Sequence, residues 1–189
     1  MTARVVILDR DGVINEDSDN YIRSLADWRP IAGSIEAISA LSQAGYTVAI
    51  ATNQSGLGRG YFELEALESI HAKLNELVAE QGGAVSGIFY CPHTPQDHCQ
   101  CRKPATGLLR AIESELCVNV RGAFFIGDSL KDLQAGESAG CRPVLVKTGK
   151  GIQTLAKIQG AGVALDMPKN IPVFADLAEA TRYILEQQH

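Results

Sequence analysis

The sequence predicts an α/β fold in which a parallel sheet carries helices on both of its faces. Two observations lead to this prediction. Short apolar runs recur along the chain, and longer amphipathic stretches separate them. A strand that is apolar at nearly every position is buried on both sides, as in a parallel sheet whose crossovers are helices. The 189 residues, of which 46% are hydrophobic and 21% charged, suit one globular domain over residues 1–189 with Rossmann-like architecture.

Strands and helices are expected to alternate from one end of the chain to the other. The apolar runs predict strands over 4–8, 46–51, 87–90, 123–126 and 143–147, with a weaker strand near 162–165. Amphipathic spacing predicts helices near 33–44, 62–81, 105–116, 130–139, 151–159 and 175–187. Ligands bind such sheets in the crevice at the carboxyl ends of the strands, so the residues after each strand carry the functional information.

Composition excludes several classes of function. The 17 basic and 22 acidic residues give a net charge of −5, which argues against a basic surface for nucleic acid or for an anionic membrane. None of the apolar runs approaches the roughly 18 residues that a membrane span requires. Asp9 and Asp11 come too early in the chain for a signal peptide. We therefore expect a cytoplasmic protein with reduced cysteines and no membrane partner.

Acidic side chains follow two of the predicted strands. Asp9 and Asp11 come after the first strand, and Asp128 comes after the fourth, with Asp132 one helical turn later. Crowded carboxylates repel one another unless a cation neutralises them, and oxygen ligands of this kind suit Mg²⁺. A carboxylate of such a site can also attack phosphorus. Solvated loop acids are the alternative interpretation, but acids at successive strand ends favour a functional site.

Four short motifs resemble those of the haloacid dehalogenase-type phosphatases and occur in the same order. They are Asp9-Arg10-Asp11-Gly12, Thr52-Asn53-Gln54, Lys103 and Gly127-Asp128-Ser129-x-x-Asp132. The resemblance implies that Asp9 is the nucleophile and that Asp11 is the general acid and later the base. It implies that Thr52 holds the transferring phosphoryl group and that Lys103 neutralises it. The implied Mg²⁺ ligands are Asp9, Asp11 and Asp128.

Cysteine and histidine residues cluster after the third predicted strand. The segment 91–101 contains Cys91, His93, Cys99 and Cys101. Three thiolates and one imidazole form the donor set of a closed, structural Zn²⁺ site. A disulfide or a pair of reactive thiols is the alternative, and His98 is a rival ligand. We expect a small zinc-binding loop, inserted in the domain, that delivers the adjacent residues 102–103 to the phosphate site.

This loop narrows the resemblance to one family. Cys91-Pro92-His93, Cys99-x-Cys101-Arg102-Lys103-Pro104 and Val13-Ile14-Asn15 resemble the D-glycero-D-manno-heptose-1,7-bisphosphate 7-phosphatases, of the histidinol-phosphatase-like subfamily. That family serves nucleotide-heptose synthesis for lipopolysaccharide cores or related glycans. The resemblance implies that the partner is a small-molecule sugar bisphosphate. The implied substrate contacts are Arg10, Asp17, Ser18, Asp19, Asn20, Thr52, Asn53, Gln54, Ser55, Arg102 and Lys103.

Other residues carry weaker signals. Arg59, in the glycine-rich segment 56–60, could meet a second phosphate, although a flexible turn is the alternative interpretation. Tyr21 and Trp28 could line a sugar pocket, and His71 is expected to be structural. Cys117 and Cys141 are expected to be buried.

The spacing of the motifs leaves no room for a cap domain. Residues 12–45 and 55–87 each hold one loop and one helix, so we expect an open pocket and a monomer. Histidinol-phosphate phosphatase is the nearest alternative function, and Val13-Ile14-Asn15 favours the heptose enzyme. A non-catalytic zinc-loop interaction module is an alternative of a different class. The complete set of acids at the predicted Mg²⁺ site argues against such a module.

Overall fold

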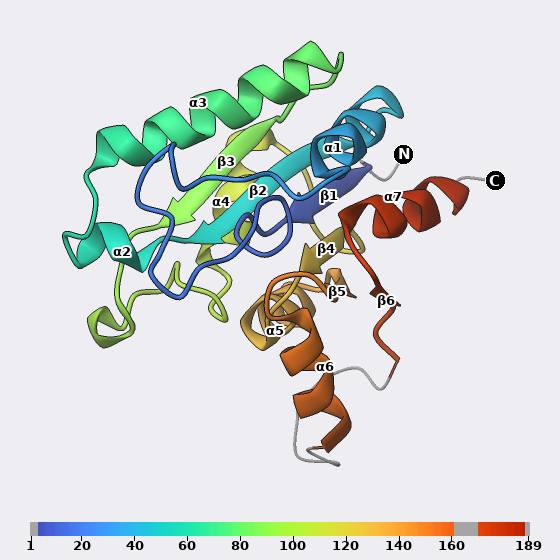
Figure 1. Cartoon of the computed structure of the whole chain (residues 1–189). Helices are drawn as coiled ribbons and strands as arrows, with labels where there is room; N and C mark the ends of the chain where they lie inside the picture. Colours follow the sequence, from blue (N-terminus) through green and yellow to red (C-terminus); the bar gives the residue numbers. More distant parts are fainter. Residues whose placement is uncertain (1–3, 161–169, 188–189) are drawn as a thin grey trace.

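The chain forms one parallel sheet with helices packed on both faces (Figure 1). The computed structural model describes residues 4–160 and 170–187, and the sheet formed by these residues has six strands in the order β3-β2-β1-β4-β5-β6. The strands are β1 (Val5–Leu8), β2 (Thr47–Asn53), β3 (Gly87–Cys91), β4 (Phe124–Gly127), β5 (Arg142–Val146) and β6 (Val173–Phe174). All neighbouring strands are parallel. The order reverses at β1, which opens a crevice at the carboxyl ends of β1 and its neighbours.

Helices cover the two faces of the sheet in separate groups. The first face carries α1 (Ser34–Gln43), α3 (Leu64–Glu80) and α7 (Leu177–Glu186), and the second carries α4 (Gly107–Leu116) and α5 (Leu130–Ser138). The helix α6 (Gly151–Gly160) follows β5 and packs against it. Within the described part of the chain, no helix is long and apolar enough to cross a membrane.

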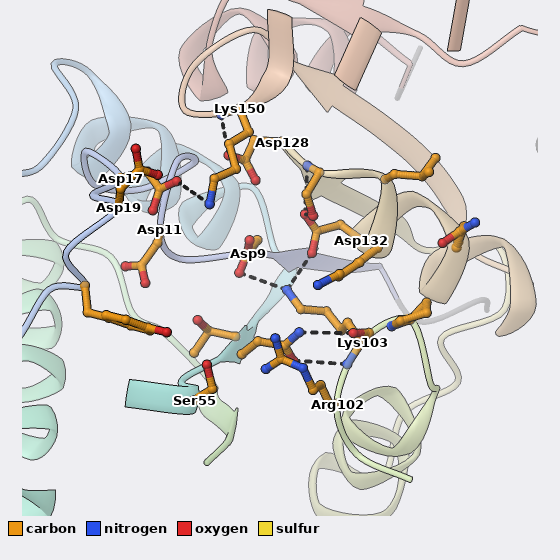
Figure 2. A pocket seen from close by; sticks show the side chains of 18 of the residues that line it. Asp9, Asp11, Asp17, Asp19, Ser55, Arg102, Lys103, Asp128, Asp132 and Lys150 are labelled. Carbon is orange, nitrogen blue, oxygen red and sulfur yellow. Dashed lines mark hydrogen bonds and ion pairs between the residues drawn. The ribbon is translucent and has the colours of Figure 1, made fainter. Parts of the chain in front are cut away.

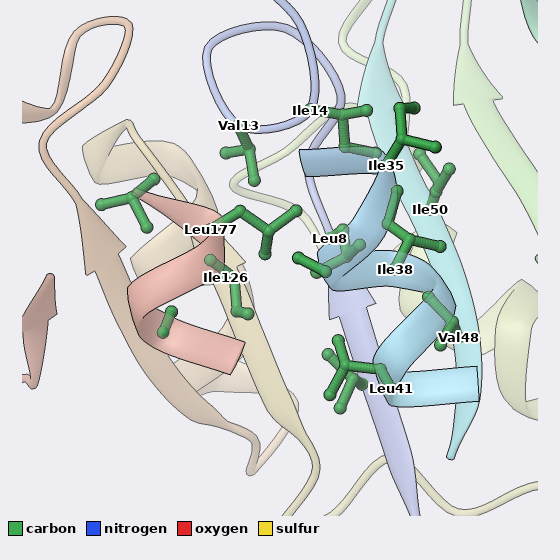
Figure 3. Packing of buried hydrophobic residues seen from close by; sticks show 14 of the residues in the cluster. Leu8, Val13, Ile14, Ile35, Ile38, Leu41, Val48, Ile50, Ile126 and Leu177 are labelled. Carbon is green, nitrogen blue, oxygen red and sulfur yellow. The ribbon is translucent and has the colours of Figure 1, made fainter. Parts of the chain in front are cut away.

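The pleat of β1 explains why its residues are apolar without interruption. Val6 and Leu8 face the helices of the first group, whereas Val5 and Ile7 face those of the second. Figure 3 shows Leu8 at the centre of the first core, beside side chains of α1 and near Leu177 of α7. Burying each such side chain stabilises the fold by about 1.5–3 kcal/mol. Both faces of the sheet therefore have their own hydrophobic core.

The structure confirms the first five predicted strands and the six predicted helices. The weak strand expected near 162–165 lies outside the described residues, and β6 was not predicted. The glycine-rich segment 56–60, for which a phosphate contact and a flexible turn were the two interpretations, begins within a short helix, α2 (Ser55–Gly58). A side chain at Gly58 would collide with the carbonyl oxygen of Pro92, so this glycine allows the backbone of α2 to approach the zinc loop.

Two of the weaker expectations need correction. Cys141 is buried as expected, but Cys117 is exposed. Cys117 ends α4 in a left-handed backbone conformation, which turns it away from the core. Trp28 is buried in the first core and is not among the residues that line the cavity at the carboxyl ends of the strands, whereas Tyr21 is.

Candidate active site

The loops at the carboxyl ends of the strands surround a cavity of about 630 Å³ (Figure 2). Asp9 follows β1 and Asp128 follows β4, and these neighbouring strands bring the two carboxylates together. Thr52 and Asn53 line the cavity from the end of β2. Lys103 enters from the segment that follows the zinc loop. Residues that are far apart in the sequence thus meet at the crevice, as predicted.

Three buried carboxylates form the acidic floor of this cavity. Asp9, Asp128 and Asp132 each offer an oxygen within 4.8 Å of the others. Burial, and then the charge of Asp132, raises the pKa of Asp128 to about 7. The same two causes raise the pKa of Asp9 well above its ordinary value. Such shifts show that the carboxylates lack enough positive charge to stay ionised together.

Lys103 supplies part of that positive charge. Its ammonium lies 2.9 Å from Asp9 Oδ1 and 2.6 Å from Asp132 Oδ1, and it donates a hydrogen bond to the Ala51 carbonyl at 2.7 Å. Burial alone would lower the pKa of Lys103, but Asp132 and Asp9 outweigh burial and raise it. The Asn53 amide also clamps the Lys103 backbone, since it accepts from the N–H at 3.0 Å and donates to the carbonyl at 3.1 Å. The side chain is therefore a fixed cation.

The remaining acidic oxygens fit a divalent metal. One lysine faces three carboxylates, the donors are all oxygen atoms, and the raised pKa values of Asp9 and Asp128 would be relieved by a cation. Gly12 has a positive φ of 84°, and a side chain there would collide with Asp128 Oδ2. Asp132 is also held by Ser129, whose N–H and hydroxyl donate to Oδ2 at 3.0 and 2.6 Å. Asp9 and Asp128 are thus the better candidates for Mg²⁺ ligands.

Asp11 lies beside this group, but its carboxylate is bound to other side chains. Arg10 donates to both oxygens, from Nε at 2.8 Å and from Nη2 at 3.1 Å. Asn15 and Gln54 donate one further hydrogen bond each, at 2.9 and 3.0 Å. Burial would raise the pKa of Asp11, but Arg10 and the hydrogen bonds from Asn15 and Gln54 together outweigh burial and lower it. Asp11 is therefore an oriented, ionised carboxylate, and its role as a metal ligand stays a prediction.

Most of the other expected contact residues line the cavity. These are Asp17, Ser18, Asp19, Ser55 and Arg102.

Four expected contact residues lie elsewhere. Arg10 and Gln54 are buried behind Asp11, which they orient. Asn20 lines a neighbouring hollow, and Arg59 is exposed at the end of α2.

The sequence-based prediction missed several cations of the cavity wall. Lys131, Lys150 and Lys157 line it, and Lys150 forms an ion pair with Asp17 at 3.0 Å (Figure 2). The backbone N–H of Lys150 also donates to Asp128 Oδ2 at 2.8 Å. Lys150 follows the fifth strand, so the search at strand ends would have found it if it had been extended to that strand.

The cysteine–histidine cluster brings four metal-binding atoms close together. Cys91 Sγ lies 3.2 Å from Cys101 Sγ and 3.6 Å from Cys99 Sγ, and His93 Nδ1 lies 3.2–3.5 Å from two of the sulfurs. Ligands of a tetrahedral zinc stand about 3.5–4 Å apart, whereas a disulfide would need about 2 Å. The four predicted ligands thus form one group that could hold Zn²⁺, and His98 is not part of it.

The same cluster also orders the next part of the chain. The Arg102 N–H donates to Cys99 Sγ at 3.4 Å, and the Arg102 guanidinium donates to the His93 carbonyl at 3.2 Å. Arg102 and Lys103 line the cavity directly after the last cysteine. The zinc loop therefore places the two cations that the sequence predicted it would deliver.

Comparisons with known proteins agree with this fold and site. A family model described as HAD-hydrolase-like matches residues 100–180. The D-glycero-beta-D-manno-heptose-1,7-bisphosphate 7-phosphatase of Pseudomonas aeruginosa is 54% identical over 186 residues, which cover 98% of this chain and 100% of the relative. The protein of the same name from Neisseria meningitidis serogroup A is 44% identical over 184 residues, which cover 97% and 96%.

A solved structure is similar over the same length. The crystal structure of D,D-heptose 1,7-bisphosphate phosphatase from B. bronchiseptica, complexed with magnesium and phosphate, is 46% identical. The two structures have a TM-score of 0.90, and the match covers 97% of this chain and 99% of the other. The parallel sheet and its acidic crevice are those of the haloacid dehalogenase class of hydrolases. Within that class, identities of 44–54% over nearly the full length show that the chain belongs to the D-glycero-beta-D-manno-heptose-1,7-bisphosphate 7-phosphatase family.

Proposed function

We propose that this chain is a Mg²⁺-dependent phosphatase that removes the C7 phosphate of D-glycero-D-manno-heptose 1,7-bisphosphate. The reaction would serve nucleotide-heptose synthesis for lipopolysaccharide cores or related glycans. The observation that carries the proposal is the position of Asp9 at the cavity floor, in contact with Lys103 and close to Asp128. Relatives that match nearly the whole chain carry the name of this activity. The zinc loop would have a structural role.

The first half of the reaction transfers the phosphoryl group to Asp9. The Asp9 carboxylate attacks phosphorus, and the bond from phosphorus to the sugar oxygen breaks. Asp11, which must take up a proton before this step, gives that proton to the departing oxygen, which becomes the C7 hydroxyl. Lys103 and the Thr52 hydroxyl counter the charge on the phosphoryl oxygens. Bound Mg²⁺, held by Asp9 and Asp128, would supply further positive charge at those oxygens.

The second half releases phosphate and restores the enzyme. Asp11, now a carboxylate, takes a proton from a water molecule that attacks phosphorus. The bond between phosphorus and the Asp9 oxygen breaks, which frees inorganic phosphate. The lowered pKa of Asp11 in the structure favours the ionised form that this half requires.

The cavity wall suits a substrate with a second phosphate. Arg102, Lys131 and Lys150 line the same cavity as Asp9. Burial, and then the charges of Arg102 and Lys150, lower the pKa of Lys131, which means that positive charge accumulates on this side. Guanidinium and ammonium groups bind phosphate oxygens well. These residues would hold the phosphate that is not hydrolysed.

The proposed catalytic groups form a complete set within one chain, so the proposed reaction requires no group from a second copy. We therefore propose that residues 1–189 form a single domain that needs no second copy for catalysis and acts in the cytoplasm. Sedimentation at the concentrations used for kinetics measures the oligomeric state, and we expect the mass of one chain.

Steady-state kinetics with two substrates test the proposed activity. With Mg²⁺ present, we expect a higher kcat/KM for the heptose bisphosphate than for histidinol phosphate. Asp9→Asn keeps the shape of the side chain but removes the nucleophile, so its kcat should fall below about one-thousandth of the wild-type value. Faster turnover of histidinol phosphate would support the alternative phosphatase. A wild-type protein inactive on both would support a non-catalytic zinc-loop module.

A further inference from the structure

Arg10 connects the catalytic loop to a helix on the first face of the sheet. Its side chain is fully buried, and two of its nitrogens hold Asp11. The third nitrogen, Nη1, lies 3.2 Å from Nε2 of His71. His71 lies in the middle of α3, 61 residues away in the sequence. A continuous chain of contacts thus runs from α3 through Arg10 to Asp11.

The chemistry of the two groups fixes the direction of this hydrogen bond. A guanidinium only donates, so His71 Nε2 must accept, and the proton of the neutral ring is on Nδ1. Burial, and then the charge of Arg10, lowers the pKa of His71 to about 4. The imidazole is therefore neutral near pH 7, which is the form that can accept from Arg10.

The helix α3 holds the imidazole in a fixed place. Ile70 and Leu74, on either side of His71 along the helix, are buried in the first hydrophobic core. The ring also packs beside Tyr90 of β3, with centroids 6.1 Å apart. A buried guanidinium nitrogen without an acceptor is costly, so Arg10 would turn towards another partner if His71 could not accept. Any such turn moves both hydrogen bonds to Asp11.

We propose that His71 is a positioning residue that sets the orientation of Asp11 by accepting a hydrogen bond from Arg10. The inference rests on the proposed role of Asp11 as acid and base, and it adds a residue to which no role in the reaction has been given. His71 is not among the residues that line the cavity, so it acts through Arg10 and does not touch the substrate.

The test compares substrates that differ in their need for an acid. Departure of a sugar alkoxide needs a proton from Asp11, whereas p-nitrophenolate leaves without one. For His71→Leu, we expect kcat/KM on the heptose bisphosphate to fall about 10- to 100-fold, mostly through a lower kcat. This loss is smaller than the full effect of a general acid because Asp11 is displaced and not removed. On p-nitrophenyl phosphate, the kcat/KM of the same variant should fall less than about threefold. We compare kcat/KM because it reports on the steps up to phosphoryl transfer to Asp9. His71→Gln offers an acceptor oxygen and should restore most of the loss.

Two controls separate positioning from general damage. Lys73→Leu places the same new side chain on α3 at an exposed site, where Lys73 forms an ion pair with Glu76. This variant should have the wild-type kcat/KM on both substrates. If His71→Leu does not fold, His71→Phe takes its place, since its ring has a similar shape and no acceptor. An equal loss on both substrates, no loss at all, or no rescue by His71→Gln in a folded protein would overturn the inference.

The wild-type protein distinguishes a failure of this inference from a failure of the proposed function. If the wild type hydrolyses an alkyl phosphate other than the heptose bisphosphate, the proposed substrate is wrong, and the same comparison on that alkyl phosphate still decides the role of His71. If the wild type hydrolyses no phosphate ester, both proposals fall.

Discussion

At the scale of single residues, Lys103 connects several groups of the site. It is a fully buried cation with two carboxylate partners, Asp9 and Asp132, and a backbone acceptor. Buried charges are stable in a protein only when they are paired in this way. The ammonium group that we propose neutralises the substrate phosphate therefore also supports the structure of the site.

Removing that ammonium should cost both activity and stability. We expect Lys103→Met to abolish phosphatase activity and to lower the free energy of unfolding by about 3–5 kcal/mol, because two buried carboxylates lose their partner. Urea unfolding measures the change. Lys147→Met, at an exposed position after β5, should change stability by less than about 0.5 kcal/mol. Similar unfolding free energies for the two variants would contradict the assigned role.

Asp128 gives the fold a pH dependence with a definite sign. Its pKa is about 7 in the folded protein against an ordinary value of 3.8, so the folded state holds the proton more tightly than the unfolded state does. Stability without Mg²⁺ should therefore fall as the pH rises from about 4 to 7, by up to about 4 kcal/mol. Thermal unfolding in Mg²⁺-free buffer measures this fall. Added Mg²⁺ should reduce this fall, and Asp128→Asn should remove the part that Asp128 contributes beside Asp9. A pH-independent difference in stability between Asp128→Asn and wild type would contradict the prediction.

At the scale of elements, we propose that the zinc loop holds Lys103, the proposed catalytic lysine, in its place in the cavity. The loop is short and has one 3-10 helix, η1 (Pro95–Asp97), so the fold of the loop depends on its four metal ligands. The segment that it holds continues directly into Lys103. Loss of the metal should thus displace Lys103 in the cavity, although the metal ligands take no part in the proposed reaction.

Two cysteines in different surroundings, Cys99 and Cys117, allow a matched test of that role. Cys99→Ser should lower the bound zinc, lower Tm by several degrees and reduce kcat, since serine is a poor zinc ligand and the loop loses its closure. Cys117→Ser changes the same atom at an exposed site outside the cluster and should leave all three quantities unchanged. Full activity of a zinc-free Cys99→Ser protein would contradict the proposal that the zinc loop holds Lys103 in place.

At the scale of the whole molecule, the sequence predicted the features that depend on local pattern. Buried strands were recognisable because a parallel sheet makes them apolar throughout. The acids and the zinc ligands were recognisable because they follow strands or lie close together in the sequence. The net charge of −5 did not indicate a phosphorylated ligand, because the basic residues that could bind phosphate are gathered in one cavity.

Features that depend on distant contacts could not be predicted in this way. The helix α2 and the strand β6 are too short to show a period. The pairing of Arg10 with His71 depends on how α3 packs over the sheet, and no local spacing reports it. The exposure of Cys117 depends on the left-handed turn that ends α4. Tertiary packing decides each of these.

The identity of the phosphate that leaves is the most direct test of the proposed function. Phosphorus NMR of D-glycero-D-manno-heptose 1,7-bisphosphate, incubated with the wild-type protein and Mg²⁺, follows both phosphates at once. We expect the C7 signal to be replaced by inorganic phosphate while the C1 signal remains, and we expect no change with Asp9→Asn. Loss of the C1 phosphate would contradict the assignment as a 7-phosphatase. An unchanged spectrum, with a wild-type protein that hydrolyses another phosphate ester, would contradict it as well.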